Sequence, residues 1–598
     1  MQQKLGLLKD TIQAIWPLAK RAILTGQILK PQCELTEADD DILCEYDVEI
    51  PMSEGFAVTV NVYRSRSAEA KNTKVPVIMC AHPYDANLTP ARKRTPFGGP
   101  PKQYRMIPQG GRPRFSRLTS WESPDPNFWV ASGYAVVNMN LPGYATSGGS
   151  PSVFSEHQAK CFYEAIEWVA KRDWCTGKVG LSGVSYLAIS QFHVAACQAY
   201  GGPPPSLGCI SPWEGLSDQY HDAMCVGGVE EIGFPAFWWV TEVKPTINSS
   251  VEEFIKTEEC LPTEALERHP FYDDYWKSKA PKLQEITVPM LVCGSFADHG
   301  LHTMGSFRAF QKANSKHKWL YTHRTGKWVS YYSDEVQNLT RDFMDCFLKD
   351  GTSQDFLQTP KVRLEVRRGR DEIHEVRFEH DWPIARTDYV RYYLDGSSLS
   401  LQSSPSATGK EVEYSGKGGS VEFLHRFSQD TEITGYMKLR LWVEARADPV
   451  GDDVPDDLVI STAVYKVNQD GGTEYFYGVI GNDKDCVTKG FCRASRRELN
   501  QAESTEWNPV LTGTSEQKLA PGQIVPVDIA LYPSSTFFAA GESLKLIISS
   551  KEIIRFAPFK KNTKDNFGQH VLHSGGEYDS YLLLPEIPKQ EQKEPLAG

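Results

Sequence analysis

Short apolar segments alternate with helical stretches between residues 46 and 355. Apolar runs occur at residues 58–62, 75–80, 134–139, 178–181, 207–210, 288–292 and 318–321. Residues 157–171 carry apolar side chains at helical spacing, and a second helix is expected from residue 186. Near-continuous apolar strands that alternate with helices are typical of a parallel sheet covered on both faces. The pattern therefore predicts an α/β domain.

The pattern changes after about residue 355. Strand-like runs follow one another with turn residues between them, at residues 362–366, 389–394, 437–443, 458–460, 525–529 and 544–548. No long helical period separates these runs. This arrangement is typical of an antiparallel β-sandwich, here of about 240 residues.

Two segments interrupt the α/β rhythm. Residues 86–125 are rich in Pro, Gly and Arg and are expected to form a long loop. Residues 212–285 combine helical stretches with many aromatic side chains, which favours a helical cap over a site. A helical appendage with its own core is an equally open interpretation. As a cap, the segment would supply pocket residues, for which the candidates are Trp213, Phe237, Trp238 and Trp239.

These patterns divide the chain into five parts. We expect an α/β catalytic domain built from residues 46–211 and 286–355, with residues 212–285 as the cap and residues 356–588 as the sandwich. Residues 1–45 form a helical lead-in, and the polar residues 589–598 form a disordered tail.

Charge and cysteine content exclude some partners. The net charge of −12 argues against nucleic acid or an anionic membrane, because both require a basic face. No run of about 18 apolar residues is present, so no membrane span is expected. The thirteen cysteines show no ligand-like spacing, which favours free thiols in a reducing compartment and no metal site. The opening residues lack the apolar core of a signal peptide. The predicted location is therefore the cytoplasm.

The strongest chemical motif lies at residues 179–188, VGLSGVSYLA. A strand runs into Gly183-Val184-Ser185 and then directly into a helix. A nucleophilic serine at a strand-to-helix turn requires small neighbours, because the turn is tight. Gly183 meets this need, whereas Leu187 stands where a second glycine is usual and Ala188 follows it. We interpret Ser185 as the nucleophile; a structural turn is the alternative.

A serine hydroxyl needs a base, and the base needs an orienting acid. In α/β-hydrolases the chain order is serine, acid, histidine. Asp298 follows the strand at 291–294, and His323 follows the strand at 318–322, so these residues are the predicted acid and base. His299 and His302 lie close to Asp298 in sequence, and His317 precedes its strand, so all three are weaker candidates.

An oxyanion needs two preorganised donors. The backbone N–H of Tyr186, the residue after the nucleophile, is one candidate. The loop after the strand at 75–80 has no Gly-rich motif, so a side-chain donor is needed there, and Tyr84 carries a suitable hydroxyl. From the residues alone, a packed loop aromatic is the better explanation of Tyr84.

Several of these motifs together resemble the CocE/NonD hydrolases, which are relatives of X-Pro dipeptidyl-peptidases. The resemblance rests on segments that occur in the same order over about residues 50–590: Pro83-Tyr84-Asp85, WCTGKVG at 174–180, Gly183-Val184-Ser185-Tyr186, Tyr275-Trp276, ITVP at 286–289, DTEITG at 430–435, Asp456-Asp457-Leu458 and HSGGEYDS at 573–580.

The resemblance implies a Ser–Asp–His triad, an oxyanion hole of a tyrosine hydroxyl and one amide, a helical cap and a jelly-roll sandwich. By position these residues are Ser185, Asp298, His323, Tyr84 and Tyr186. Where relatives carry a Gly-Pro-Trp-x-His loop, this chain has YTHRTGKW at 321–328; where they carry Asp-x-Arg-Gly, it has NMNLPG at 138–143. Jelly-roll relatives often form dimers, which leaves a homodimer open.

The resulting hypothesis is a serine hydrolase that cleaves an ester, amide or thioester of a small, apolar substrate through an acyl-enzyme, without cofactor or metal. An acyltransferase or cyclising enzyme with the same triad is one alternative, since water exclusion beneath the cap would change the acceptor. A catalytically inactive binding protein is another. An aminopeptidase would require an acidic pocket, which the sequence does not locate.

A fluorophosphonate probe separates the nucleophile from its neighbour. We expect Ser185→Ala to abolish labelling, because the oxygen that the probe phosphonylates is removed, while Ser182→Ala keeps it. Gel fluorescence of the labelled protein measures both. Labelling that survives in Ser185→Ala and disappears in Ser182→Ala would contradict the assignment.

Overall fold

The computed structural model describes residues 16–92, 99–351, 355–449, 453–564 and 566–588. Part of the expected lead-in, residues 1–15, and the expected tail, residues 589–598, lie outside these ranges. Residues 16–24 are helical, as expected for the lead-in. No helix in the described ranges has the length and apolar character that crossing a membrane requires.

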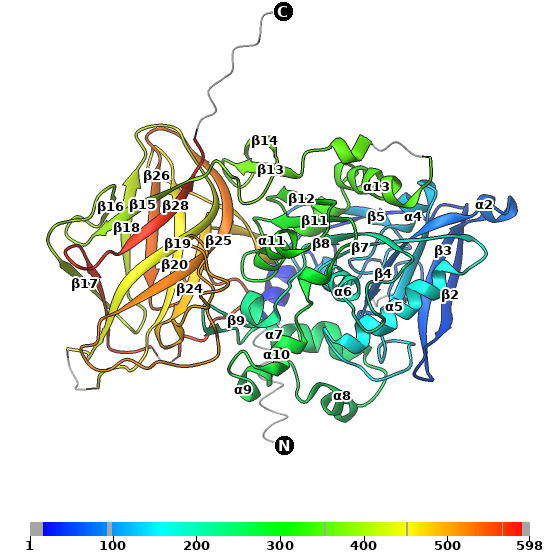
Figure 1. The fold of residues 1–598 in the computed structure, drawn as a ribbon, viewed down its shortest axis with the longest axis horizontal. Helices are drawn as coiled ribbons and strands as arrows, with labels where there is room; N and C mark the ends of the chain where they lie inside the picture. Colours follow the sequence, from blue (N-terminus) through cyan, green and yellow to red (C-terminus); the bar gives the residue numbers. More distant parts are fainter. Residues whose placement is uncertain (1–15, 93–98, 352–354, 450–452, 565, 589–598) are drawn as a thin grey trace, which may run out of the picture.

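A mixed sheet forms the centre of the α/β half (Figure 1). Its strand order is β2 (Ile42–Pro51), β3 (Ala57–Ser65), β6 (Ala135–Asn140), β4 (Val75–His82), β7 (Cys175–Val184), β8 (Leu207–Trp213), β11 (Met290–Ser295), β12 (Lys318–His323) and β13 (Val362–Arg367). The strands from β6 to β13 run parallel. The predicted α/β-hydrolase core is therefore confirmed, and its central strands are apolar and buried.

Helices cover both faces of this sheet. The helices α5 (Glu156–Ala170) and α6 (Tyr186–Ala195) pack against one another and against β7, while α13 (Asp334–Leu348) contacts β7 and β8. In Figure 1, α13 lies above the strands and α5 and α6 lie below them. Two glycines, Gly180 and Gly208, admit the side chains of α13, because an added Cβ would lie 2.6 Å from Leu348 in each case.

The segment at 212–285 folds into short helices at one end of the sheet, among them α7 (Phe234–Trp238), α8 (Val251–Glu258), α9 (Ala265–Arg268) and α10 (Asp274–Ser278). It has a small apolar cluster of its own around Tyr220, Met224 and Trp276. Other aromatic residues of the segment join the main core, including Phe237 and Trp239. Both interpretations of this segment therefore apply, since it has its own core and also packs onto the α/β domain.

The C-terminal half is all β. One sheet contains β15 (Asp388–Asp395), β28 (Tyr581–Glu586), β19 (Thr431–Arg446) and β25 (Val525–Phe538); the other contains β18 (Ser420–Arg426), β26 (Ser543–Ser549), β20 (Val459–Val467) and β24 (Thr488–Arg493). Their apolar faces enclose a second core. The predicted sandwich is confirmed, and the exact domain boundaries stay a prediction.

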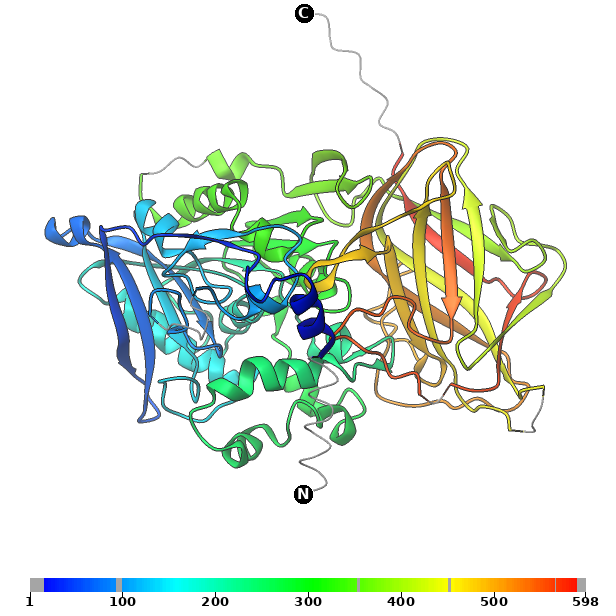
Figure 2. The same cartoon turned by 180° about the vertical axis from the view of Figure 1, so that it is seen from behind.

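One strand departs from the predicted division. Residues 362–366 were expected in the sandwich, but β13 pairs in parallel with β12 of the α/β sheet and also meets β25 of the sandwich through Arg367 and Thr536. The two halves therefore share a continuous hydrogen-bonded connection through β13. Figures 1 and 2 show the α/β half and the sandwich side by side from opposite directions.

Arg367 closes this junction. Its guanidinium is fully buried and donates to the backbone carbonyls of Ser535, Phe296 and Val487 at 3.0–3.2 Å. It also lies 4.6 Å from the ring centre of Phe476. Burial lowers the pKa of Arg367 to about 10, so the side chain keeps its charge at neutral pH. One cation thus binds three segments that are remote in sequence.

Replacing Arg367 tests the importance of this junction. We expect Arg367→Met to lower the thermal midpoint by roughly 5 °C or more, because it leaves buried carbonyls without donors. The adjacent, half-exposed Arg368 offers a matched control, and Arg368→Met should change the midpoint by no more than about 1 °C. Scanning calorimetry measures both; equal midpoints would contradict the role of Arg367.

Candidate active site

Ser185 occupies a sharp turn between a strand and a helix. Strand β7 ends at Val184 and helix α6 begins at Tyr186, so Ser185 is the single residue between them. Its backbone has φ 60° and ψ −116°, in a region that residues with a Cβ rarely adopt. Such a strained turn raises the serine hydroxyl above the end of the sheet. The predicted nucleophile elbow is present in the backbone.

The neighbours of Ser185 explain its unusual motif. A Cβ on Gly183 would lie 2.5 Å from the Cβ of Leu187, so only glycine fits opposite this leucine. Ala188 packs against Gly215, where an added Cβ would lie 3.1 Å from the alanine methyl. The small partner that the turn requires is therefore Gly215 from the loop after β8, and Leu187 can replace the usual second glycine.

His302 is the histidine that contacts Ser185. Its Nε2 lies 3.2 Å from the Ser185 Oγ, and its Nδ1 contacts the Asp298 Oδ2 on the opposite side of the ring. Asp298 follows β11, and His302 immediately precedes helix α11 (Thr303–Lys312). Both side chains are buried, with 2% exposure each. The structure thus aligns Ser185, His302 and Asp298 in one hydrogen-bonded chain.

His323, the predicted base, does not contact Ser185. It ends β12 and its Nε2 lies 2.7 Å from the Oε1 of Glu214. Its ring stacks on Trp213 at 5.5 Å, on the strand face that Tyr321 also occupies. Because alternate residues of a strand share a face, the position of His323 in β12 directs its side chain toward this aromatic group. The expected contact between His323 and Ser185 is therefore corrected to His302.

The signal for His302 was present in the sequence. Asp298 and His302 are four residues apart, and the chain between them turns, with the Leu301 amide donating to the Asp298 carbonyl. Side chains separated by four residues meet on one side of a helical turn. Proximity in sequence is therefore no argument against this pair, because it is the reason that the two side chains meet.

A buried cation joins this chain. Lys327, the first residue of helix α12 (Lys327–Tyr331), lies with its Nζ 3.1 Å from the Asp298 Oδ2 and 3.0 Å from the His302 Nδ1. Its side chain is 4% exposed. Glu214 also lies in this cluster. The side chains of Glu214, Asp298 and His302 each place an atom that could bind a metal ion within 4.8 Å of the other two. Sequence analysis missed both Lys327 and Glu214.

Burial and neighbouring charges shift the pKa values of the two acids in this cluster in opposite directions. Burial opposes ionisation of Asp298, but Lys327 and His302 outweigh it and hold the pKa of Asp298 below its usual range. Burial and the charge of Asp298 raise the pKa of Glu214 well above its usual range, which favours its neutral form. Burial and Lys327 lower the pKa of His302 to about 4, so its imidazole is neutral.

The same atoms have the spacing of a cation site. Glu214, Asp298 and His302 form one such group, and Glu214, Cys293 and His323 form another. However, the ammonium of Lys327 already lies next to two atoms of the first group, and a metal ion there would meet a positive charge. The arrangement suits proton transfer between Ser185 and His302 better than metal binding.

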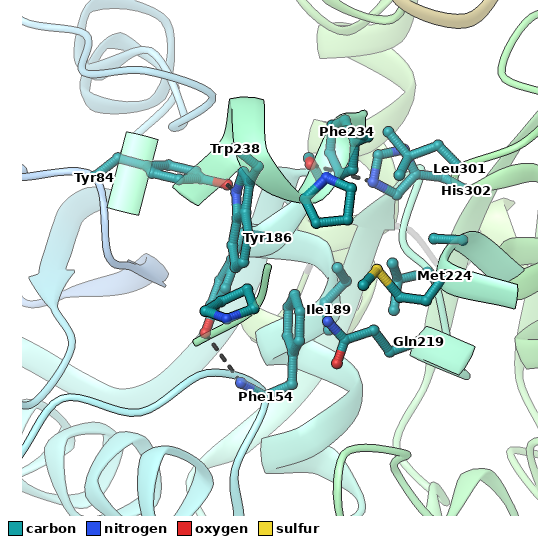
Figure 3. Close-up of a pocket in the computed structure, with 15 residues that line it drawn as sticks. Tyr84, Phe154, Tyr186, Ile189, Gln219, Met224, Phe234, Trp238, Leu301 and His302 are labelled. Atoms are coloured by element: carbon teal, nitrogen blue, oxygen red, sulfur yellow. Dashed lines mark hydrogen bonds between the residues drawn. The ribbon is translucent and has the colours of Figure 1, made fainter. Parts of the chain in front are cut away.

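Two candidate donors face the nucleophile. Tyr84 is buried, and its hydroxyl accepts a hydrogen bond from the Trp238 Nε1 at 3.2 Å, which leaves the hydroxyl hydrogen available (Figure 3). Burial and the charge of Glu122 raise the pKa of Tyr84 well above its usual range, so the phenol keeps its proton. Tyr186 opens helix α6, where a backbone N–H has no carbonyl partner within the helix.

A mostly apolar pocket adjoins Ser185 and His302. It encloses about 510 Å³ including its mouth, within the usual range for small-molecule sites. Figure 3 shows its walls converging from the α/β domain and the cap. The lining residues are Tyr84, Phe154, Ser185, Tyr186, Ile189, Leu216, Gln219, Ala223, Met224, Phe234, Pro235, Trp238, Pro262, Leu301 and His302. Gln219 is the one amide in this lining, and none of these residues carries a carboxylate.

Only one of the four predicted cap aromatics lines this pocket. Trp238 does, stacked on Phe154 at 5.8 Å. Trp213, the last residue of strand β8, packs against Tyr321 and His323, and Trp239 packs on Phe254 at 4.7 Å. Phe237 is also buried in the main core. The expectation for these three is corrected. Trp213 leaves its strand toward the rings of Tyr321 and His323, and neighbouring side chains of the helical run at 237–239 point in different directions, so only Trp238 faces the site.

Twelve of the thirteen cysteines are buried, and Cys44 is half-buried. Cys293 lies at the end of β11 near the site, where burial raises the pKa of its thiol well above the usual range. Such a thiol is a poor nucleophile. The serine is therefore the reactive candidate of this pocket.

An α/β-hydrolase core with a serine at the strand-to-helix turn defines a serine hydrolase. Residues 54–328 match the family model of X-Pro dipeptidyl-peptidase (S15 family), and residues 354–583 match that of the X-Pro dipeptidyl-peptidase C-terminal non-catalytic domain. The chain belongs to the CocE/NonD family of hydrolases, as its similarity to a solved member of that family shows. A CocE/NonD family hydrolase from Staphylococcus aureus is 32% identical, with a TM-score of 0.82 over 91% of this chain and 94% of the other.

Two further relatives cover nearly the whole chain. Cocaine esterase from Rhodococcus sp. (strain MB1 Bresler) is 23% identical over 91% of this chain and 98% of its own length. An aminopeptidase from the marine sediment archaeon Thaumarchaeota archaeon has a TM-score of 0.66 at 14% identity, over 93% of this chain and 98% of its own, which shows a shared fold alone. The family-model match, cocaine esterase and the Staphylococcus aureus hydrolase together place the chain among serine hydrolases that act on ester or amide bonds.

Proposed function

We propose that the chain cleaves an ester or neutral amide of a small, apolar acyl group, with Ser185 as nucleophile, His302 as base and Asp298 as orienting acid. The observation that carries the proposal is the hydrogen-bonded chain from Ser185 through His302 to Asp298 at the wall of an apolar pocket. The name of the relative cocaine esterase supports an ester as the bond cleaved.

The proposed reaction begins with proton transfer. The Ser185 Oγ attacks the substrate carbonyl while the His302 Nε2 takes the hydroxyl proton, and the negative charge of Asp298 stabilises the resulting imidazolium. The carbonyl oxygen becomes an oxyanion, which the Tyr84 hydroxyl and the Tyr186 amide stabilise by donating hydrogen bonds. The imidazolium then returns its proton to the leaving group as the carbonyl–leaving-group bond breaks. Water, deprotonated by His302, resolves the acyl-enzyme in the same way.

The walls of the pocket favour a neutral substrate over a substrate amine. A second cavity shares Met224, Pro235 and Pro262 with the first and contains Glu230 and Glu231. The Oε1 of Glu231 accepts from the backbone amides of Gly233, Phe234 and Lys560, and its Oε2 lies 3.4 Å from the Lys561 Nζ. This buried carboxylate is therefore engaged by the protein, which argues against an aminopeptidase role.

Replacing each of the two histidines in turn by glutamine tests the proposed base. We expect His302→Gln to lower kcat/KM for a 4-nitrophenyl ester of a short fatty acid by roughly 10³-fold or more, because His302 is the base whose ring nitrogen contacts the Ser185 hydroxyl. His323→Gln is the matched control and should cost less than about tenfold. Steady-state kinetics with circular dichroism checks both variants; a larger loss in His323→Gln would reject His302 as the base.

The Tyr84 hydroxyl is tested by removing a single atom. We expect Tyr84→Phe to lower kcat by roughly 10²–10³-fold with little change in KM, since its hydrogen bond forms only with the oxyanion. Tyr144→Phe is a suitable control, because that buried hydroxyl donates to the Ser152 carbonyl away from Ser185. Equal kcat values for Tyr84→Phe and the unmodified protein would exclude the hydroxyl from the oxyanion site.

A further inference from the structure

Lys327 is the one cation within hydrogen-bonding distance of Asp298 and His302 among the described residues. Its Nζ donates to the Asp298 Oδ2 at 3.1 Å, the same oxygen that His302 contacts through Nδ1. The side chains of all three are at most 4% exposed. Solvent therefore screens their charges weakly, and each charge strongly affects the others.

The chain fixes the position of this ammonium. Lys327 opens α12 directly after Gly326, and a Cβ on Gly326 would lie 2.1 Å from the backbone carbonyl oxygen of Gln109. Only glycine permits this close approach of two loops. The stem of Lys327 is thus anchored at its backbone, and its Nζ also lies 5.4 Å from the ring centre of Trp328.

We propose that Lys327 is a positioning residue that keeps the pair of Asp298 and His302 in its working charge state, with an anionic carboxylate and a neutral imidazole. The inference rests on the proposed function. A positive charge next to the carboxylate stabilises the anion, and the same charge 3.0 Å from Nδ1 opposes a second proton on the ring. The Nδ1–H group then donates a hydrogen bond to the Asp298 carboxylate, and Nε2 stays free to accept the proton of Ser185.

The surrounding groups act in the same direction or are neutral. Glu214 faces Asp298 from the loop after β8, and burial and the charge of Asp298 raise its pKa well above the usual range, which favours its neutral form. Glu122, hydrogen-bonded to the Trp328 Nε1 at 3.0 Å, has its pKa raised to about 8 by burial. His323 is neutral, because burial lowers its pKa to about 4. Asp298 is therefore the principal negative partner of Lys327 at neutral pH.

Removing the cation should shift the pH dependence of Ser185 reactivity. His302 must be neutral to act, so reactivity falls as pH decreases through its pKa. Without Lys327 the imidazole gains a proton more readily, and Asp298 also becomes protonated at higher pH. Both changes move the acidic limb of the pH profile, where reactivity falls as pH decreases, to higher pH. We expect Lys327→Met to raise its midpoint by about one pH unit or more.

The measurement is the second-order rate of fluorophosphonate labelling between pH 4 and 10, which needs no natural substrate. Because the pKa of His302 is about 4, a shift of one unit should make Lys327→Met label about fivefold more slowly than the unmodified protein at pH 4 and about twofold more slowly at pH 5, and the two rates should converge near pH 9. Lys327→Arg keeps the charge and should leave the midpoint within about half a unit. Lys466→Met removes another buried, ion-paired lysine, in the sandwich, and should not move the limb.

Each outcome decides one of the two proposals. A uniform loss of labelling at every pH in Lys327→Met, or no shift of the limb, would overturn the role of Lys327. Lys327→Gln gives the same test if the methionine variant does not fold. Labelling that persists in Ser185→Ala would instead reject the proposed function. A shifted limb in both neutral variants, with an unshifted limb in Lys327→Arg, supports the inference.

Discussion

Burying the carboxylate of Asp298 imposes the main physical constraint on this molecule. An ionised carboxylate at 1% exposure is costly unless cations and donors surround it. Two segments bring these partners together: the turn that ends at His302 and the loop that ends at Lys327. The ends of β11 and β12 set the positions of both segments. Strand pairing, helix placement and close glycine contacts together bring these partners to the Asp298 carboxylate. The same arrangement aligns the hydroxyl of Ser185 with His302.

Most of the fold followed from periodicity, because a parallel sheet and a sandwich differ in how apolar residues alternate with turns. The serine turn was also predictable, since Gly183, Ser185 and the following helix lie within one short segment. The partner of Ser185 was not. His302 and His323 both follow strands of the same sheet, and their choice depends on which way each side chain leaves the backbone. A turn of four residues directs His302 to the site, while strand alternation directs His323 to Trp213.

The aromatic cap shows a similar limit of sequence reasoning. A run such as Phe237, Trp238 and Trp239 distributes its rings around a helical turn, so only one of the three reaches the pocket. That ring has two functions, because Trp238 lines the cavity and its indole N–H contacts the Tyr84 hydroxyl. Cap position and the geometry of the candidate oxyanion donor are therefore linked through a single side chain. Composition can indicate that a cap is aromatic, but it does not identify the ring that faces a substrate.

The contacts of Arg367 have an evolutionary consequence. The guanidinium binds the Phe296 carbonyl, two residues before Asp298, together with carbonyls of the sandwich. The sandwich is therefore part of the support of the active-site loop rather than an attached accessory. Recombination that exchanged this half for an unrelated β-domain would remove partners of a charge buried at the junction. A replacement for either half would therefore have to supply new partners for the Arg367 guanidinium at this junction.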